Sequence, residues 1–166
     1  MSRILFMIVG SFVFCLSSCA PPANKTAADV RVLDYGIYEA VVLLEGSFAL
    51  GQTPRVASVQ GIKHLETTTD IPCEVGTFFG CRLDPATLPR QYEFRTKFTH
   101  PPFAEPGGEL TNKSIQSGTI KPDYFWDGRQ LWFFLEGFEY EMIPGTWSLE
   151  IWIDNLQVAD FDFDVR

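Results

Sequence analysis

The sequence predicts an all-β protein, a single domain folded as an immunoglobulin-like antiparallel β-sandwich. Two observations support this prediction. Apolar and polar residues alternate in the stretches 91–100 and 145–165, which is the period of a strand with one buried face. Further candidate strands recur at short, regular spacings, and we find no convincing helical periodicity with caps. This pattern is typical of a sandwich.

The stretch 145–165 has the strongest strand pattern. Its first half places apolar side chains at every second position: Trp147, Leu149, Ile151 and Ile153. A turn is expected at Asp154-Asn155, and the second half then alternates apolar with acidic residues: Phe161, Phe163 and Val165 against Asp160, Asp162 and Asp164. Alternate strand residues lie about 6.8 Å apart, too far for the three aspartates to share one calcium ion. We therefore interpret the aspartates as a solvated face, and expect no metal site.

The remaining strands are expected at Val30–Tyr38, Val41–Leu44, Arg55–Leu65, Gln91–His100, Thr119–Trp126 and Arg129–Glu136. Pro101 and Pro102 should end the fourth of these, because proline cannot donate to a strand ladder. The polar stretch Glu105–Gly118 is predicted as a long loop. The last two strands are predicted to form a hairpin that turns at Asp127-Gly128.

The N-terminal region predicts export and lipid anchoring. Residues 1–18 combine Arg3 with an apolar run, as in a signal peptide. The sequence Leu16-Ser17-Ser18-Cys19 resembles the lipobox of bacterial lipoproteins, which implies cleavage before Cys19 and a lipid on its sulfur. Residues 19–28 are then a tether, and the domain spans 29–166. Ala20 after the cysteine implies an outer-membrane location, facing the periplasm. An ordinary cleaved signal peptide and an uncleaved anchor are the alternatives.

Charge and cysteine content restrict the classes of partner and of chemistry that we expect. The formal net charge is −8, which argues against a nucleic-acid partner. With Cys15 removed and Cys19 lipidated, Cys73 and Cys81 remain, and an oxidising envelope favours a disulfide between them. A redox or metal-binding pair is the rival interpretation, but the two cysteines lack the usual motif spacing.

The sequence carries no recognised catalytic or cofactor motif. We therefore expect no catalytic residue and no cofactor. His64 and His100 are the only histidines. A hydrolase that uses His100 with Glu141 or Asp123 remains the enzymatic alternative.

An aromatic strip is the candidate binding surface. If Leu131, Phe133 and Leu135 face the core, the alternate residues of that strand face outward. The predicted strip then consists of Tyr124, Trp126, Trp132, Phe134 and Trp152. Such a strip suits a sugar ring or a protein partner. The alternative is that both faces are covered.

Several short motifs resemble an uncharacterised bacterial domain-of-unknown-function family with an immunoglobulin-like ending. They are Phe79-Gly80, Thr99-His100-Pro101-Pro102, Tyr124-Phe125-Trp126, Pro144-Gly145-x-Trp147 with Glu141 before it, and Phe163-x-Val165. The resemblance covers about Val30 to Val165 and implies no activity. We expect a lipid-anchored envelope protein whose non-catalytic domain binds a protein or glycan. A structural or inhibitor-type lipoprotein without a ligand is the other non-enzymatic alternative.

Overall fold

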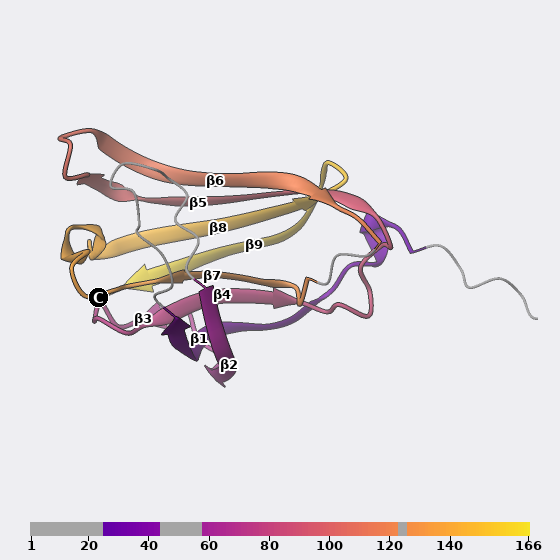
Figure 1. Cartoon of the computed structure of the whole chain (residues 1–166), viewed down its shortest axis with the longest axis horizontal. Coiled ribbons are helices and arrows are strands. Elements are labelled where there is room, and N and C mark those ends of the chain that lie inside the picture. Colours follow the sequence, from indigo (N-terminus) through magenta and orange to yellow (C-terminus); the bar gives the residue numbers. More distant parts are fainter. Residues whose placement is uncertain (1–24, 44–57, 123–125) are drawn as a thin grey trace, which may run out of the picture.

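The computed structural model describes residues 25–43, 58–122 and 126–166, and these form two β-sheets packed face to face (Figure 1). The predicted all-β sandwich is confirmed. Cys19 and most of the predicted tether lie outside the described residues. No helix in the described part of the chain is long and apolar enough to cross a bilayer.

Sheet A has four strands in the order β2-β1-β4-β7: Ser58–Glu66, Val32–Leu43, Phe78–Leu83 and Arg129–Phe133. Sheet B has five strands in the order β3-β9-β8-β5-β6: Asp70–Ile71, Leu156–Val165, Gly145–Ile153, Tyr92–Ala104 and Leu110–Ile120. Neighbouring strands are antiparallel except β3, which is parallel to β9. Two short 3-10 helices, η1 (Ala27–Asp29) and η2 (Glu139–Glu141), complete the described elements.

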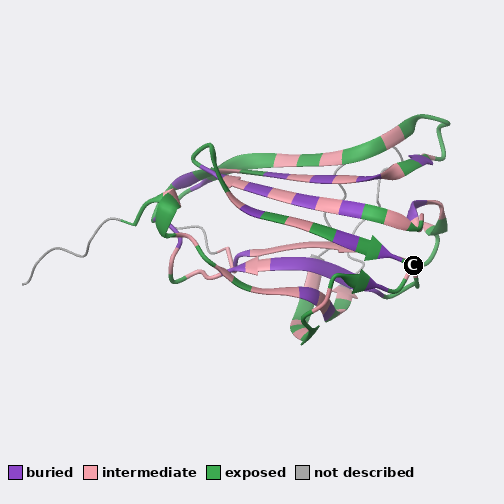
Figure 2. Ribbon diagram, turned by 180° about the vertical axis from the view of Figure 1, so that it is seen from behind, coloured by how far each residue is buried: buried purple, intermediate pink, exposed green. Residues whose placement is uncertain are grey.

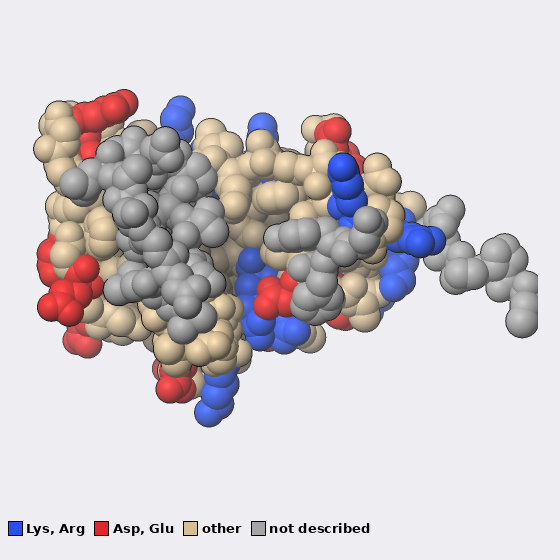
Figure 3. All heavy atoms as spheres, in the orientation of Figure 1, with Lys and Arg blue, Asp and Glu red and all other residues tan. Residues whose placement is uncertain are grey.

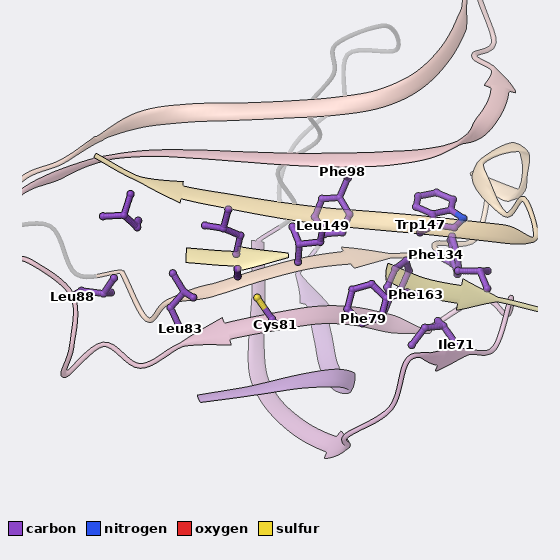
Figure 4. Close-up of a cluster of buried hydrophobic side chains, with 14 of the residues drawn as sticks. Ile71, Phe79, Cys81, Leu83, Leu88, Phe98, Phe134, Trp147, Leu149 and Phe163 are labelled. Atoms are coloured by element: carbon purple, nitrogen blue, oxygen red, sulfur yellow. The ribbon is translucent and has the colours of Figure 1, made fainter. Parts of the chain in front are cut away.

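The core fills the space between the sheets and centres on Phe79 of β4 (Figure 4). Rings from four other residues surround it with centroid separations of 5.4–6.5 Å: Phe98, Phe134, Trp147 and Phe163. Such edge-to-face and tilted contacts add to the stabilisation from area burial. Along β8, buried and partly exposed residues alternate as predicted (Figure 2).

The predicted turn between β8 and β9 is confirmed. Asp154 and Asn155 have φ angles of 48° and 67°, so both occupy the left-handed region. This is the conformation that a two-residue type I′ hairpin requires, and Asn and Asp tolerate it better than other side chains.

The predicted loop Glu105–Gly118 is wrong. Strand β5 continues through Pro101 and Pro102 to Ala104, and after a tight turn β6 begins at Leu110. A register shift between Thr99 and Phe103 marks the place where the prolines interrupt the ladder with β6. Prolines are accommodated at such irregularities, so they did not end the strand.

The predicted hairpin after Thr119 is also wrong. Strand β6 ends at Ile120 in sheet B, whereas β7 begins at Arg129 in sheet A. The intervening residues therefore cross from one sheet to the other. This crossing leaves β6 and β7 as edge strands of different sheets.

The predicted disulfide is not formed, because Cys73 and Cys81 are separate free thiols. Cys81 is fully buried on β4, and Figure 4 places Phe79 between Cys81 and Ile71. The Cys73 N–H donates to the carbonyl of Arg166, next to the end of β9. Strand β4 then carries Cys81 about 10 Å beyond the strand's first residue, since each residue advances about 3.3 Å.

Candidate binding site: the edge cleft

A cleft opens between the edge strands of the two sheets. It encloses about 660 Å³ of empty space, open solvent at its mouth included. We call it the edge cleft, and its described lining residues are Thr96, Phe98, Ser114, Gln116, Gln130, Leu131, Trp132, Phe133, Leu135, Phe138 and Glu141. Strands β5, β6 and β7 thus supply most of the lining, with η2 at one end.

The unequal strand number of the sheets explains the edge cleft. Strand β7 lies opposite β5, as shown by the contact between Trp132 and Phe98, whose ring centroids are 5.4 Å apart. Sheet B continues one strand beyond β5, to β6, and sheet A has no described strand opposite β6. The inward side chains of β6 are consequently polar: Ser114 and Gln116, which lie beside Phe98 and Thr96 of β5.

The open edge of β7 presents backbone hydrogen-bonding groups. Leu83 N–H donates to the Gly128 carbonyl, and Phe134 N–H donates to the Thr77 carbonyl. Since hydrogen-bonded pairs alternate along an antiparallel ladder, even-numbered residues of β7 bond to β4. The N–H and C=O groups of Leu131 and Phe133 therefore point away from β4. Within the described residues, neither has a hydrogen-bond partner.

Trp132 contributes a second unsatisfied donor to the lining. Its ring packs against Trp147 and His100, with centroids 5.1 and 5.6 Å away. Its indole Nε1 is buried and has no hydrogen-bond acceptor in the described part of the chain. A buried N–H without an acceptor is unfavourable, and this atom is not exposed to the cleft.

Comparison with known proteins identifies the family. The family model described as "Domain of unknown function (DUF3859)" matches residues 26–165. The chain belongs to this family. The DUF3859 domain is also similar to a solved structure, an immunoglobulin-like protein from Pseudomonas aeruginosa, with a TM-score of 0.58 and 20% sequence identity. That similarity covers 84% of this chain and 98% of the other, and it confirms the predicted immunoglobulin-like fold. No curated protein gives a significant match.

The predicted outward aromatic strip is wrong for Trp132 of β7 and for Phe134, which follows β7 directly. Phe134 is only 1% exposed and belongs to the core. Trp132 is paired with the fully buried Phe79, so it faces the core as well. Leu131 and Phe133 instead lie on the outer face of sheet A. Both faces of β7 are apolar, so alternation alone could not distinguish them.

The other members of the predicted strip are separated. Trp126 of the DUF3859 domain stacks on Phe94, with ring centroids 5.9 Å apart, and packs against the core. Tyr124 lies outside the described residues. Trp152 does face outward on sheet B, where the Arg95 guanidinium lies 4.1 Å from its ring centroid in a cation–π contact.

The outer face of sheet B around Trp152 is a second, more polar hollow. Its lining residues are Glu93, Phe94, Arg95, Ser117, Gly118, Thr119, Trp152 and Asn155. The Arg95 guanidinium covers the Trp152 ring, so that ring is not free for stacking. We therefore assign the edge cleft, rather than this hollow, as the candidate site.

His100 has the surroundings of a structural histidine. It is 4% exposed, and its ring stacks between Phe103 and Trp147, at centroid distances of 4.5 and 4.8 Å. Its Nδ1 lies 3.0 Å from the Pro101 carbonyl, which can only accept, so Nδ1 carries the proton. Burial lowers the pKa of His100 and favours the neutral ring, although the hydrogen bond to Pro101 opposes this.

The remaining candidates for chemistry are dispersed. His64 lies on the other sheet from His100, and its Nε2 donates a hydrogen bond to the Tyr35 carbonyl, 2.9 Å away. Among the described residues, no group of three or more His, Cys, Asp or Glu side chains is arranged to hold a metal ion. Asp123, one of the two carboxylates considered with His100, lies outside the described residues.

The sequence did not indicate the edge cleft because its β6 side was predicted as a loop. Ser114, Gln116 and Ile120 do follow the two-residue period of a strand. Polar inward residues weaken that signal, since they match the pattern of a solvated loop equally well. Strand β5 pairs with β8 on one side and with β6 on the other. The need for a strand on the second side could be inferred only once β8 had been placed on the first.

Proposed function

We propose that this DUF3859 chain is a lipid-anchored, non-catalytic binding module of the cell envelope. In this proposal, the edge cleft receives an extended segment of a protein partner. The observation that carries it is the open edge of β7, where the backbone groups of Leu131 and Phe133 face a cleft with apolar and amide side chains. Extended peptides bind to such edges by adding a strand.

A strand added beside β7 would complete sheet A opposite β6. Its backbone would pair with Leu131 and Phe133, and every second side chain would point between the sheets. Those side chains would meet Phe98 and Gln116 on sheet B.

A glycan is the second candidate ligand. Gln116 and Gln130 offer amide groups to hydroxyls, and Phe98 and Trp132 offer rings. Both rings are, however, engaged in the core: they contact each other, Trp132 also contacts Trp147, and Phe98 also contacts Phe79. The free backbone groups of an edge strand favour a polypeptide, because they match its regular spacing.

The binding test compares neighbouring substitutions at the mouth of the cleft. Leu135 lines the edge cleft, whereas Glu136 is exposed next to it. In the full chain, we expect Leu135→Arg to abolish photo-crosslinking from an unnatural residue at Gln130 to an envelope protein, and Glu136→Arg to preserve it. Retention on purified peptidoglycan, lost only in Leu135→Arg, would indicate the glycan instead. Binding unaffected by Leu135→Arg would contradict the assignment of the cleft.

The anchoring part of the proposal is supported by the lipobox resemblance around Cys19. Two or more acyl chains on one residue give stable membrane attachment. Cys19→Ala should therefore move the chain from the membrane fraction to the soluble fraction of cells, whereas Cys15→Ala should leave it membrane-bound. Membrane fractionation that is the same for Cys19→Ala and the unaltered chain would contradict lipidation.

A further inference from the structure

We propose that two copies of the chain associate through their β6 edges, in an antiparallel register centred on Gln116. Their two B sheets would then form one continuous sheet around a two-fold axis. This interface goes beyond the proposed partner binding: it uses the backbone edge of β6, whereas the partner pairs with the backbone of β7, although the Gln116 side chain also lines the edge cleft. The two proposals can therefore fail independently.

The outer edge of β6 presents a row of backbone groups that pair with no other strand in the described part of the chain. Asp154 N–H donates to the Glu93 carbonyl, so odd-numbered residues of β5 bond to β8. Even-numbered residues of β5 then bond to β6, in an unbroken register from Tyr92↔Ile120 to Thr99↔Lys113. The outward N–H and C=O groups of β6 consequently belong to Lys113, Ile115, Ser117 and Thr119. Of these, the Lys113 carbonyl already accepts a hydrogen bond from the Thr111 hydroxyl.

From Ser114 to Ile120, this edge lacks the devices that usually block strand addition. β3 and β7 are short edges of two and five residues. β2 carries Lys63, His64 and Glu66, and its pairing with β1 is interrupted by register shifts. β6, by contrast, has eleven residues with a single charged side chain, Lys113, and with no proline. Natural proteins normally protect such an edge with charges, prolines or bulges, or pair it.

The sequence of β6 is complementary to itself in one register. Centring the antiparallel pairing on Gln116 places Lys113 opposite Thr119 and Ile115 opposite Ser117. All four outward residues then form hydrogen-bonded pairs, and no two cations face each other. Ile115, whose side chain is 47% exposed in the single chain, is covered by the second copy. Interfaces with a two-fold axis require this kind of self-complementarity.

Charge distribution also favours a second copy at this edge. The chain has a net charge of −8, so copies repel each other where carboxylates gather. Asp160, Asp162 and Asp164 lie on β9, separated from β6 by β8 and β5. Figure 3 shows several acidic side chains at the left-hand end of the molecule and others near its middle and its upper right. The middle of β6 is the neutral stretch through which two acidic copies can approach.

The register is tested by single cysteines in the full chain, oxidised in cells. In a non-hydrogen-bonded pair the two Cα atoms at position 116 would lie about 4.5 Å apart, within disulfide range. Position 114 of one copy would lie opposite 118 of the other, about 13 Å from its own counterpart. We expect Gln116→Cys to give a disulfide-linked dimer, at least about tenfold more than Ser114→Cys or the unaltered chain.

A disruption experiment completes the test. Adding Ile115→Lys to Gln116→Cys places a second cation at the centre of the edge and should remove the linked dimer, while Leu135→Arg should not affect it. Circular dichroism and the melting temperature establish that each variant is folded. No linked dimer from Gln116→Cys, equal dimer from Ser114→Cys, or dimer that persists with Ile115→Lys would each overturn the proposal.

Discussion

Two glycines allow the central strands of sheet A to lie close to their neighbours. Gly36 of β1 and Gly80 of β4 are directly paired, and both have positive φ angles, of 119° and 149°. A Cβ on Gly36 would lie 2.1 Å from the Glu66 carbonyl oxygen, and one on Gly80 would lie 2.1 Å from the Gln130 carbonyl oxygen. These distances are shorter than any real contact, so only glycine fits.

We predict that Gly80→Ala lowers the free energy of unfolding by about 3 kcal/mol or more, because β4 and β7 must separate to admit the methyl group. Gly76→Ala is the matched control, since φ there is also positive, at 91°, but a Cβ would meet no atom within 4 Å. It should cost only about 1–2 kcal/mol of backbone strain. Urea unfolding measures both, and equal losses would contradict the role of the close approach.

His100 should make stability depend on pH near neutrality. Burial lowers its pKa in the folded state, so the unfolded chain binds the proton more readily. The stabilisation is thus present above the unfolded pKa of about 6.5 and is lost as the pH falls below it. We predict a falling unfolding free energy between about pH 7.5 and 5.5. His100→Phe, which keeps an aromatic ring, should flatten this slope, while His64→Gln should keep it. If the pH dependence of the unfolding free energy is unchanged in His100→Phe, a group other than His100 causes it.

At the scale of elements, the closing ribbon shows how a local sequence can specify a strand pair. Asp154 and Asn155 adopt the left-handed turn, and Asp154 Oδ1 also accepts a hydrogen bond from Glu93 N–H at 2.9 Å. The turn sets the pairing beside it and ties the ribbon to β5, and a register shift between Ile151 and Trp152 then brings Phe161 and Phe163 opposite the core residues of β8. Both the alternation and the turn residues could be read directly from the sequence.

We predict that Asn155→Val destabilises the protein by about 1–2 kcal/mol, because a β-branched side chain is strained at a φ of 67°. Asn155→Gly should leave stability unchanged or slightly higher, since Asp-Gly is a preferred type I′ sequence. The midpoint of denaturant unfolding distinguishes them. A loss in Asn155→Gly as large as in Asn155→Val would implicate the asparagine side chain itself.

The elements that the sequence mispredicted have different physical causes. β6 was missed because its inward residues Ser114 and Gln116 face a cleft, so the polar pattern of a solvated loop and of this strand coincide. The inner and outer faces around β7 were predicted the wrong way round, because Leu131 and Phe133 are as apolar as Trp132 and Phe134. The edge cleft depends on both strands, so it could not be predicted before the sheets were assembled.

At the scale of the whole molecule, the reactivity of Cys81 measures opening of the sandwich, whereas that of Cys73 measures exposure in the folded state. Cys81 is 0% exposed, and burial, with a smaller effect of Asp34, raises its pKa to about 12. Cys73 is partly exposed, and its pKa is raised by partial burial. The thiolate is the reactive form, so Cys81 should react with an alkylating reagent only when the sandwich opens, whereas Cys73 should react in the folded state.

We predict that Gly80→Ala accelerates alkylation of Cys81 by about a hundredfold, matching a loss of about 3 kcal/mol. The rate at Cys73 should change little, which makes it an internal control. Peptide mass spectrometry after timed labelling measures both sites in one sample. Alkylation of Cys81 as fast as that of Cys73 in the unaltered chain would contradict the buried thiol, and failure of both to react without reductant would restore the disulfide.

Strand β9 has a consequence for the timing of biosynthesis. It lies between β3 and β8 and supplies Phe163 and Val165 to the core. Its Asp164 pairs with Asp70, a residue far away along the sequence. The sandwich therefore lacks an inner strand until residue 165 has been made. Contacts so distant along the chain also form slowly. We therefore expect the domain to close only after its synthesis rather than strand by strand, which is compatible with the export that we propose.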